Sequence, residues 1–281
     1  MTDSIDTSTA SIARVYDAFL GGKDNFAVDR EVHDAIVEIA PEGPALAQDG
    51  RRFLSRAVTH LAAEGGIDQF LDMGCGLPTR DNTHEAAQRV NSDAAVVYVD
   101  NDPAVAAYGR AFLTTGPNTH LVNQDLRAPD AVFSDPVLTG ALDFTRPIAL
   151  MQCGTLHHLD DDDRPDAVMH AYIDALPVGS FVVFSHFYLP DQSDPGYVLA
   201  REIERRFRSS SMGTSRFRTT HEITAFLAGL ELLPAGPQTD AAPIVPVAQW
   251  WPSGPPLRPA RPMDSLFVGG LARKPASPST N

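Results

Sequence analysis

The sequence is short of cysteine, of long apolar runs and of positive charge. Its two cysteines, Cys75 and Cys153, exclude a disulfide framework and favour a reducing cytoplasm as the compartment. No apolar run is long enough to cross a bilayer, and the first ten residues lack the basic and apolar regions of a secretory signal. Lys and Arg number 22 against 36 Asp and Glu, a formal net charge of -14 that disfavours a nucleic acid or an anionic membrane as partner. We therefore expect a cytoplasmic protein whose partner is a small molecule.

One stretch organises the rest of the chain, the run from Phe70 to Pro78, which reads FLDMGCGLP. Apolar residues lead into Asp72, and Gly74 and Gly76 then allow positive φ and a close approach of the backbone to a ligand. A polar helix is expected to begin near Asn82, and its first turn would offer free N–H groups. A strand, a glycine turn and a helix in this order predict a cofactor site.

Two classes of cofactor use such a turn. A dinucleotide site favours G-x-G-x-x-G, whose third glycine packs the helix on the strand. Here Thr79 stands at the third position, and Pro78 beside it would narrow a pyrophosphate-binding turn. The run from Asp72 to Gly76 is instead similar to D-x-G-x-G, the first motif of class I S-adenosylmethionine (SAM) methyltransferases. The motif alone leaves one alternative open, a βα turn whose glycines serve only tight packing.

Short apolar runs alternate with helical patterns from Phe70 onward. This alternation predicts an α/β fold with a doubly wound, mostly parallel sheet and right-handed crossovers. Besides the strand that leads into Asp72, the expected strands cover residues 94–100, 119–123, 147–152, 181–186, 230–233 and 266–268. The expected helices cover residues 11–20, 27–40, 44–63, 103–113, 163–176, 197–207 and 220–227.

The same patterns divide the chain into regions. Residues 1–10 are polar and are expected to form a disordered tail. Residues 11–66 are helical and precede the first strand, so we expect them to form a cap over the sheet. Residues 67–274 would then form the cofactor-binding domain, with a short tail at 275–281. Within it, residues 243–262 hold seven prolines and both tryptophans, which excludes a regular helix or central strand and predicts an ordered loop.

Acidic residues follow the second and third expected strands. Asp100 ends the second strand, where a carboxylate can accept hydrogen bonds from both hydroxyls of a ribose. An NAD site would use an acid at the same place, and helix capping by Asp100 or Asp102 is a further alternative. Asp125 follows the third strand and could accept from an adenine amine, with Leu126 against the ring. A solvated loop aspartate is the other interpretation of Asp125.

The end of the fourth expected strand carries two histidines, His157 and His158. This strand is expected beside the first one, so Cys153 and Gly154 would line the methionine part of SAM. We expect no metal site, because the four acids from Asp160 to Asp163 complement a helix start. His157 could be a general base or a packed, hydrogen-bonded side chain. Cys75 and Cys153 are expected as reduced thiols on the pocket floor, and a redox-sensitive pair is the alternative.

Four segments together resemble the actinobacterial SAM-dependent methyltransferase family formerly known as DUF574. They read RVYDAFLGGKDNF from Arg14, QFLDMGCGLPT from Gln69, VYVDNDP from Val97 and GSFVVFSH from Gly179. The resemblance runs from about Ser11 to Leu271, and it implies a seven-stranded class I methyltransferase sheet that binds SAM. It also implies that the first helices fold over the cofactor, with Lys23 at the methionine carboxylate and Tyr16 or Asn25 facing the acceptor. It brings no established substrate.

These observations predict a SAM-dependent methyltransferase that acts on a small molecule and releases S-adenosylhomocysteine. The alternatives are a non-catalytic regulator that binds SAM or S-adenosylhomocysteine, and a nicotinamide oxidoreductase. The sequence indicates no oligomeric state. The candidates for a catalytic role are His157, His158, His186 and Tyr16. The candidates for cofactor binding are Tyr16, Gly22, Lys23, Asn25, Asp72, Gly74, Cys75, Gly76, Asp100, Asn101, Asp125, Leu126, Cys153 and Gly154.

Overall fold

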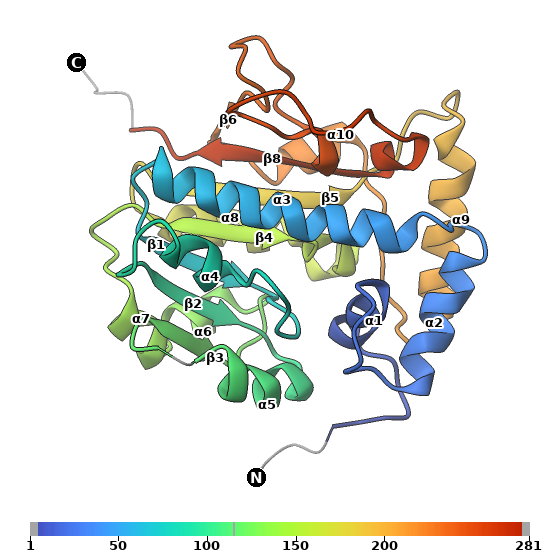
Figure 1. Cartoon of the computed structure of the whole chain (residues 1–281), viewed down its shortest axis with the longest axis horizontal. Coiled ribbons are helices and arrows are strands. Elements are labelled where there is room, and N and C mark those ends of the chain that lie inside the picture. Colours follow the sequence, from blue (N-terminus) through green and yellow to red (C-terminus); the bar gives the residue numbers. More distant parts are fainter. Residues whose placement is uncertain (1–4, 115, 277–281) are drawn as a thin grey trace.

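A single mixed β-sheet forms the centre of the protein, with helices on both of its faces (Figure 1). The computed structural model describes residues 5–114 and 116–276. In these residues the strand order is β3-β2-β1-β4-β5-β8-β6, and β7 pairs with β8 beside β6. The strands are β1 (Gln69–Met73), β2 (Ala95–Val99), β3 (Thr119–Val122), β4 (Ala149–Cys153), β5 (Phe181–Phe187), β6 (Glu231–Leu233), β7 (Val245–Pro246) and β8 (Phe267–Arg273).

The sheet confirms the predicted α/β, doubly wound and mostly parallel architecture. Strands β1 to β5 are parallel to their neighbours, whereas β8 runs antiparallel to β5, β6 and β7. Seven strands form the expected path, and the two-residue β7 is an addition to it. Because the strand order reverses between β1 and β4, this pair marks the point where a ligand is expected in such a sheet.

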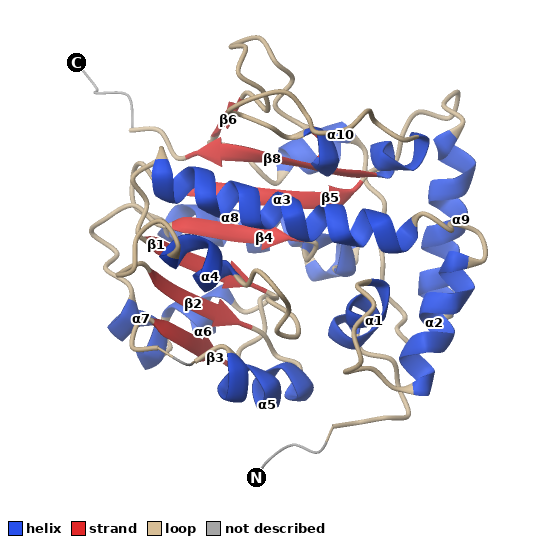
Figure 2. Ribbon diagram, viewed as in Figure 1, coloured by secondary structure: helices blue, strands red, loops and turns tan. Residues whose placement is uncertain are grey.

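The helices cover the two faces in a way that follows the alternation of side chains along each strand. Phe70 of β1 packs in a core with α3, whereas Leu71 packs in a core on the other face with α6, α7 and α8. Figure 2 shows α3 and α4 in front of the sheet. The helices are α1 (Ile12–Phe19), α2 (Ala27–Val37), α3 (Gly43–Ala63), α4 (Thr83–Gln88), α5 (Pro103–Phe112), α6 (Pro129–Phe133), α7 (Pro136–Ala141), α8 (Pro165–Ala175), α9 (Gly196–Ser209) and α10 (Thr220–Ala225).

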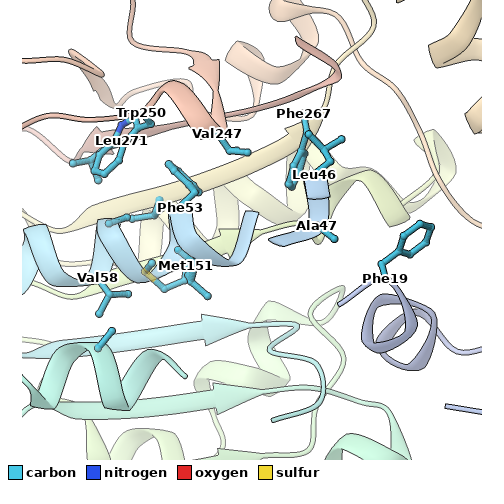
Figure 3. Packing of buried hydrophobic residues seen from close by; sticks show 14 of the residues in the cluster. Phe19, Leu46, Ala47, Phe53, Val58, Met151, Val247, Trp250, Phe267 and Leu271 are labelled. Carbon is cyan, nitrogen blue, oxygen red and sulfur yellow. The ribbon is translucent and has the colours of Figure 1, made fainter. Parts of the chain in front are cut away.

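Helix α3 is the longest of these helices, and it differs in position from the predicted cap. It presents Phe53, Ala57 and Val58, all fully buried, to the sheet and to the C-terminal strands. Figure 3 shows Phe53 beside Trp250 on this face. Helices α1 and α2 stand beyond the carboxyl ends of β1, β2 and β4, where α9 also lies (Figure 1). The cap expected over residues 11–66 is therefore reduced to these two short helices.

The ends of the chain differ from the predicted tails where they are described. Residues 5–10 are held at both ends, because Ile5 contacts a small apolar cluster that includes Leu77 and Ala10 is buried, whereas residues 6–9 between them are exposed. The backbone carbonyl of Thr9 accepts a hydrogen bond from Arg14 Nη2 at 2.6 Å. The expected tails at residues 1–4 and 277–281 lie outside the described residues. No helix in the described part of the chain has the length and apolarity needed to cross a membrane.

The proline-rich segment contains β7 and two short 3-10 helices, η3 (Val247–Gln249) and η4 (Pro262–Leu266). Trp250 is fully buried and packs edge-on against Phe53 of α3, with the ring centroids 5.3 Å apart. The Arg56 side chain of α3 donates to the backbone carbonyls of Val247, at 2.7 Å, and Trp250, at 3.2 Å. Helix α3 therefore holds this segment both by packing on the Trp250 ring and by hydrogen bonds to its backbone.

Helices α6 and α7 are absent from the sequence analysis, and strand β8 is longer than predicted. Helices α6 and α7 are too short to show an apolar period, and each begins with a proline at its first position. Strand β8 continues through Gly269 and Gly270, which are poor strand formers. A Cβ at Gly269 would lie 2.8 Å from Phe184 O, and one at Gly270 would lie 2.5 Å from Pro243 O. The glycines are therefore required by close approach of neighbouring backbone.

Candidate functional site

A cavity of about 490 Å³ opens at the carboxyl ends of the parallel strands. Its lining comes from the ends of β1, β4 and β5 and the start of β8, from the segments that follow β1, β2, β3 and β4, and from α1, α2, α3, α9 and the loop after α9. Its volume falls within the range of about 300–1,000 Å³ that is usual for small-molecule sites. The lining includes most of the residues predicted for cofactor binding, namely Tyr16, Asp72, Gly74, Cys75, Gly76, Asp100, Asn101, Asp125, Leu126, Cys153 and Gly154.

The glycine turn after β1 forms one wall of the cavity. Gly74 has φ +59° and Gly76 has φ +68°, a left-handed conformation that other residues adopt with strain. A Cβ on Gly74 would lie 2.6 Å from Thr155 Cγ2, whereas a Cβ on Gly76 would meet open space. Gly74 is therefore needed for packing, and Gly76 leaves its side of the turn free for a ligand.

Asp100 lies against this turn at the end of β2. Its Oδ2 accepts from Gly76 N at 2.9 Å, and its Oδ1 accepts from Asp102 N at 2.9 Å. Burial raises the pKa of Asp100 to about 6, although the two N–H groups oppose the rise. Asp102 caps α5, since its Oδ1 accepts from Ala104 N at 2.7 Å. Capping and ligand binding are thus divided between two acids, and Asp100 keeps acceptor capacity for a ligand.

Asp72 lies at the floor of the cavity and is almost completely buried. Its Oδ2 accepts from Thr83 Oγ1 at 2.6 Å, which ties β1 to the first turn of α4. Burial raises the pKa of Asp72 to about 6, while the hydrogen bond from Thr83 and the positive charge of Arg51 act in the opposite direction. Asp72 therefore acts first as a structural link between strand and helix.

Asp125 lines the cavity with Leu126 but already has a partner. Arg127 donates to it through its backbone N–H at 2.8 Å and through Nη2 at 2.6 Å. Burial favours a raised pKa for Asp125, yet the bonds from Arg127 and Asn101 outweigh it and lower the pKa. A carboxylate held in this way stays ionised and keeps lone pairs for a further donor.

The two cysteines lie on the floor of the cavity as free thiols. Cys75 Sγ faces Gly76 O at 3.6 Å, and Cys153 Sγ faces Val183 O at 3.8 Å. Burial raises the pKa of both thiols, which keeps them protonated and unreactive.

Gly22, Lys23 and Asn25, from the segment that reads GGKDN, do not line the cavity. This corrects their predicted role in cofactor binding. Lys23 is exposed, and Gly22 and Asn25 instead build the turn after α1. Asp17 Oδ2 accepts from Asn25 Nδ2 at 2.8 Å, and a Cβ on Gly22 would lie 1.9 Å from Asp17 Oδ1. The motif therefore shapes a turn around Asp17, a buried acid that the sequence analysis did not single out.

Arg51 of α3 brings a positive charge to the cavity, which Lys23 does not. It lines the cavity, and its Nη2 donates to Thr79 Oγ1 at 2.8 Å. Its Nε is buried and has no hydrogen-bond partner among the described residues. The helical period contained a signal for it, since Arg51 shares a face of α3 with Ala47 and Leu54, which are buried. A positive charge on an otherwise apolar helix face indicates a negatively charged partner in the cavity, because a buried charge is costly without one.

The predicted catalytic residues separate into two groups. His157, His158 and Tyr16 line the cavity, whereas His186 does not. His186 is buried behind them, with its Nδ1 2.7 Å from Phe187 O, so its predicted catalytic role is wrong on position. Tyr16 donates to Ala47 O at 3.1 Å, and burial raises its pKa to about 12, so it is a donor and not a base.

His157 and His158 are uncharged in this environment. Burial lowers the pKa of His157 well below its usual value, and neighbouring His158, His186 and Arg218 add to the effect. Burial likewise lowers the pKa of His158 to about 4. His158 Nδ1 lies 3.0 Å from Thr214 Oγ1, whereas His157 Nδ1 is buried without a hydrogen-bond partner in the described chain. Within that same part, no group of three or more His, Cys, Asp and Glu side chains could hold a metal ion.

Comparison with known proteins places the chain among methyltransferases. A family model described as S-adenosyl methyltransferase matches residues 1–275. A candidate methyltransferase of Thermobifida fusca shares 41% identity, with 96% of this chain and 97% of that chain covered and a TM-score of 0.86. A DUF574-family protein of Streptomyces avermitilis shares 35% identity, with 97% and 100% covered and a TM-score of 0.87. Among curated proteins, none matches this chain.

Proposed function

Because the chain belongs to the S-adenosyl methyltransferase family, we propose that its cavity binds SAM and that the methyl group passes to a small-molecule acceptor held in the same cavity. The observation that carries this proposal is the convergence of the open Gly76 turn, the Asp100 carboxylate and the Arg51 guanidinium on one cavity at the β1/β4 switch point.

The residues of the cavity fit the chemistry of SAM. The orphaned Nε of Arg51 is a donor that suits the methionine carboxylate, and it replaces Lys23 in that role. Asp100 retains lone pairs for the two ribose hydroxyls. Asp125 offers an acceptor for the adenine amine, and Leu126 offers an apolar surface for the ring. The methionine carboxylate, the ribose and the adenine therefore each have a candidate partner, and these partners come from α3 and from the segments after β2 and β3.

SAM supplies a methyl group on a positively charged sulfur, and the product is S-adenosylhomocysteine. Transfer of this group depends mainly on holding the acceptor in line at close distance. The cavity continues from the cofactor residues to His157 and to rings at the ends of β5 and β8, and this part is where we place the acceptor. No comparison supports the non-catalytic regulator or the nicotinamide oxidoreductase.

Calorimetric titration of the purified protein with SAM, S-adenosylhomocysteine and NAD tests the proposal. We expect the first two to bind and NAD not to bind. Asp100→Ala is expected to lose most of the SAM affinity, because the variant removes both ribose acceptors and a buried anchor of the glycine turn. Unchanged affinity in this variant would refute the ribose assignment. A matched control is Asp93→Ala, which removes an exposed acid far from the cavity lining.

A further inference from the structure

The cavity has a second half that the cofactor residues do not account for. We define the aromatic compartment by His157, Phe187, Phe207, Met212, Phe217 and Phe267, all of which line the cavity. These residues come from the ends of β4 and β5, the start of β8, helix α9 and the loop after it. In the sheet order β5 and β8 lie on the opposite side of β4 from β2 and β3. Helix α9 stands beyond β5 and β8 in Figure 1.

The rings of the compartment form a connected set. The ring of Phe187 is stacked with His157, with centroids 3.9 Å apart, and with Phe217, with centroids 4.8 Å apart. Phe267 meets Phe187 edge-on at 5.4 Å. A cavity lined by aromatic rings favours an aromatic guest, because such a guest can make offset or edge-to-face contacts with them.

The compartment contributes no charged side chain to the cavity lining. The two arginines that flank Phe217 in the sequence are already paired: Arg216 Nε lies 2.7 Å from Asp160 Oδ1, and Arg218 Nη2 lies 3.0 Å from Asp161 Oδ1. Arg218 also donates to the carbonyl of Leu159 at 2.9 Å. A charged acceptor would therefore lose its hydration without gaining a counterion, which selects for an uncharged molecule.

Two polar groups interrupt the apolar walls. His157 Nδ1 is buried and unpartnered in the described chain, and His158 Nδ1 faces Thr214 Oγ1 at 3.0 Å. Burial keeps both imidazoles neutral, so each has one nitrogen that can accept a hydrogen bond. A neutral imidazole nitrogen accepts a stronger hydrogen bond from the hydroxyl of a phenol, whose pKa is about 10, than from an aliphatic alcohol, which is far less acidic.

We propose that the methyl acceptor is an uncharged, planar aromatic molecule with a phenol-type hydroxyl, bound in the aromatic compartment with that hydroxyl at His157 Nδ1. This inference rests on the proposed function, since the cofactor must occupy the other half of the cavity. In the transfer, a lone pair of the acceptor oxygen forms the bond to the methyl carbon. The carbon–sulfur bond breaks with its electron pair remaining on sulfur, and the hydroxyl proton leaves to solvent, while His157 Nδ1 orients the oxygen by accepting the hydrogen bond that the hydroxyl donates.

The test uses binding without turnover. The full chain is saturated with S-adenosylhomocysteine and titrated with 2-naphthol, with 2-naphthoate as the charged analogue and with naphthalene as the analogue that lacks the hydroxyl. Fluorescence of the naphthyl group reports binding. We expect 2-naphthol to bind at least tenfold more tightly than 2-naphthoate.

Two variants assign the contacts. His157→Phe keeps a flat ring but removes the acceptor nitrogen, and it is expected to weaken 2-naphthol about fivefold to tenfold while naphthalene is unaffected. Phe187→Leu is expected to weaken both neutral ligands about threefold to tenfold, whereas Phe144→Leu, a change outside the cavity lining, leaves them unchanged. S-adenosylhomocysteine affinity, measured by calorimetry, should be the same in all of these proteins.

The possible failures are distinguishable. If S-adenosylhomocysteine binds but 2-naphthol binds no better than 2-naphthoate, the acceptor class is wrong and the proposed function stands. If His157→Phe leaves 2-naphthol affinity unchanged, the contact at His157 is wrong. If S-adenosylhomocysteine itself does not bind, the proposed function fails and this inference fails with it.

Discussion

At the scale of single residues, the chemistry depends on ionisable groups whose pKa values the fold shifts away from their usual range. Asp100 and Asp72 both have pKa values raised to about 6 by burial, whereas Asp125 has a lowered pKa because Arg127 holds it. The three acids that the sequence placed at strand ends therefore differ in role. Asp72 is a structural link, Asp125 is a fixed anion, and Asp100 is the acid that we assign to the ligand. Asp72 and Asp100 both respond to pH near 6.

The first prediction concerns the pH dependence of SAM binding. Ribose hydroxyls donate to the ionised form of Asp100, so binding is complete above the raised pKa and weakens as the pH falls through about 6. From pH 7.5 to pH 5.0 we expect a loss of about tenfold from this group, because one pH unit below the pKa leaves about a tenth of it ionised. Calorimetry at both pH values measures the change. Asp100→Asn should bind more weakly and with a smaller pH dependence, and an affinity of the natural protein that does not change with pH would contradict the assignment.

The second prediction concerns Arg51. Arg51→Met keeps the apolar stem but removes the charge, and we expect it to lose SAM affinity roughly 10- to 100-fold, since hydrogen bonds to charged groups contribute about 1.5–3 kcal/mol. Adenosine, which has no carboxylate, should bind both proteins equally in calorimetry. Arg52→Met is the matched control, because Arg52 is exposed and pairs with Asp49 instead. Equal losses for SAM and adenosine would show that Arg51 does not contact the carboxylate.

At the scale of elements, the structure depends on contacts between segments that are distant in the sequence. Strand β8 pairs with β5, β6 and β7, and its Gly269 lets the backbone of β5 and the ring of Phe53 approach closely. Helix α3 provides Arg51 to the cavity and Arg56 to the proline-rich segment. One helix therefore connects the candidate site to the C-terminal part of the fold.

The third prediction compares the two adjacent tryptophans. Trp250→Ala is expected to destabilise the fold by about 3–5 kcal/mol, because the ring is fully buried against Phe53. Trp251→Ala should lower the free energy of unfolding far less, by about 0.5–1 kcal/mol, since Trp251 is half-buried and mainly stacks on Arg56. Urea denaturation measures both values. Similar losses for the two variants would argue against Trp250 as the residue that fixes the segment.

At the scale of the whole molecule, the cofactor is expected to contact residues from β1, β2, β3, β4 and α3 at once. A ligand at one hundred times its dissociation constant adds about 2.7 kcal/mol to the free energy of unfolding. For a chain of this size that gain corresponds to a rise in melting temperature of about 5–10 °C. Thermal unfolding with SAM and with NAD measures it, and the fourth prediction is a rise with SAM alone. A comparable rise with NAD would indicate a dinucleotide site.

The sequence by itself determined the sheet, the glycine turn and the acids at the strand ends. These features are encoded locally, by apolar runs, by glycine where φ must be positive and by the reading order of strands along the chain. Motifs that span nearly the whole chain were enough to identify the family, and the family model confirms it. The one pair of neighbours that the sequence analysis named, the first and fourth strands, is confirmed by the pairing of β1 with β4.

Only the tertiary structure decided which side chains face the cavity. It showed that four residues predicted for the site do not line the cavity, namely Gly22, Lys23, Asn25 and His186. It also showed that Arg51, which was not predicted, does line it. It also brought Phe187, Phe217 and Phe267 together, although β5, the loop after α9 and β8 are separated along the chain. Periodicity can show that a residue is buried but not which residue it faces, because that depends on how α3, α9 and β8 pack on the finished sheet.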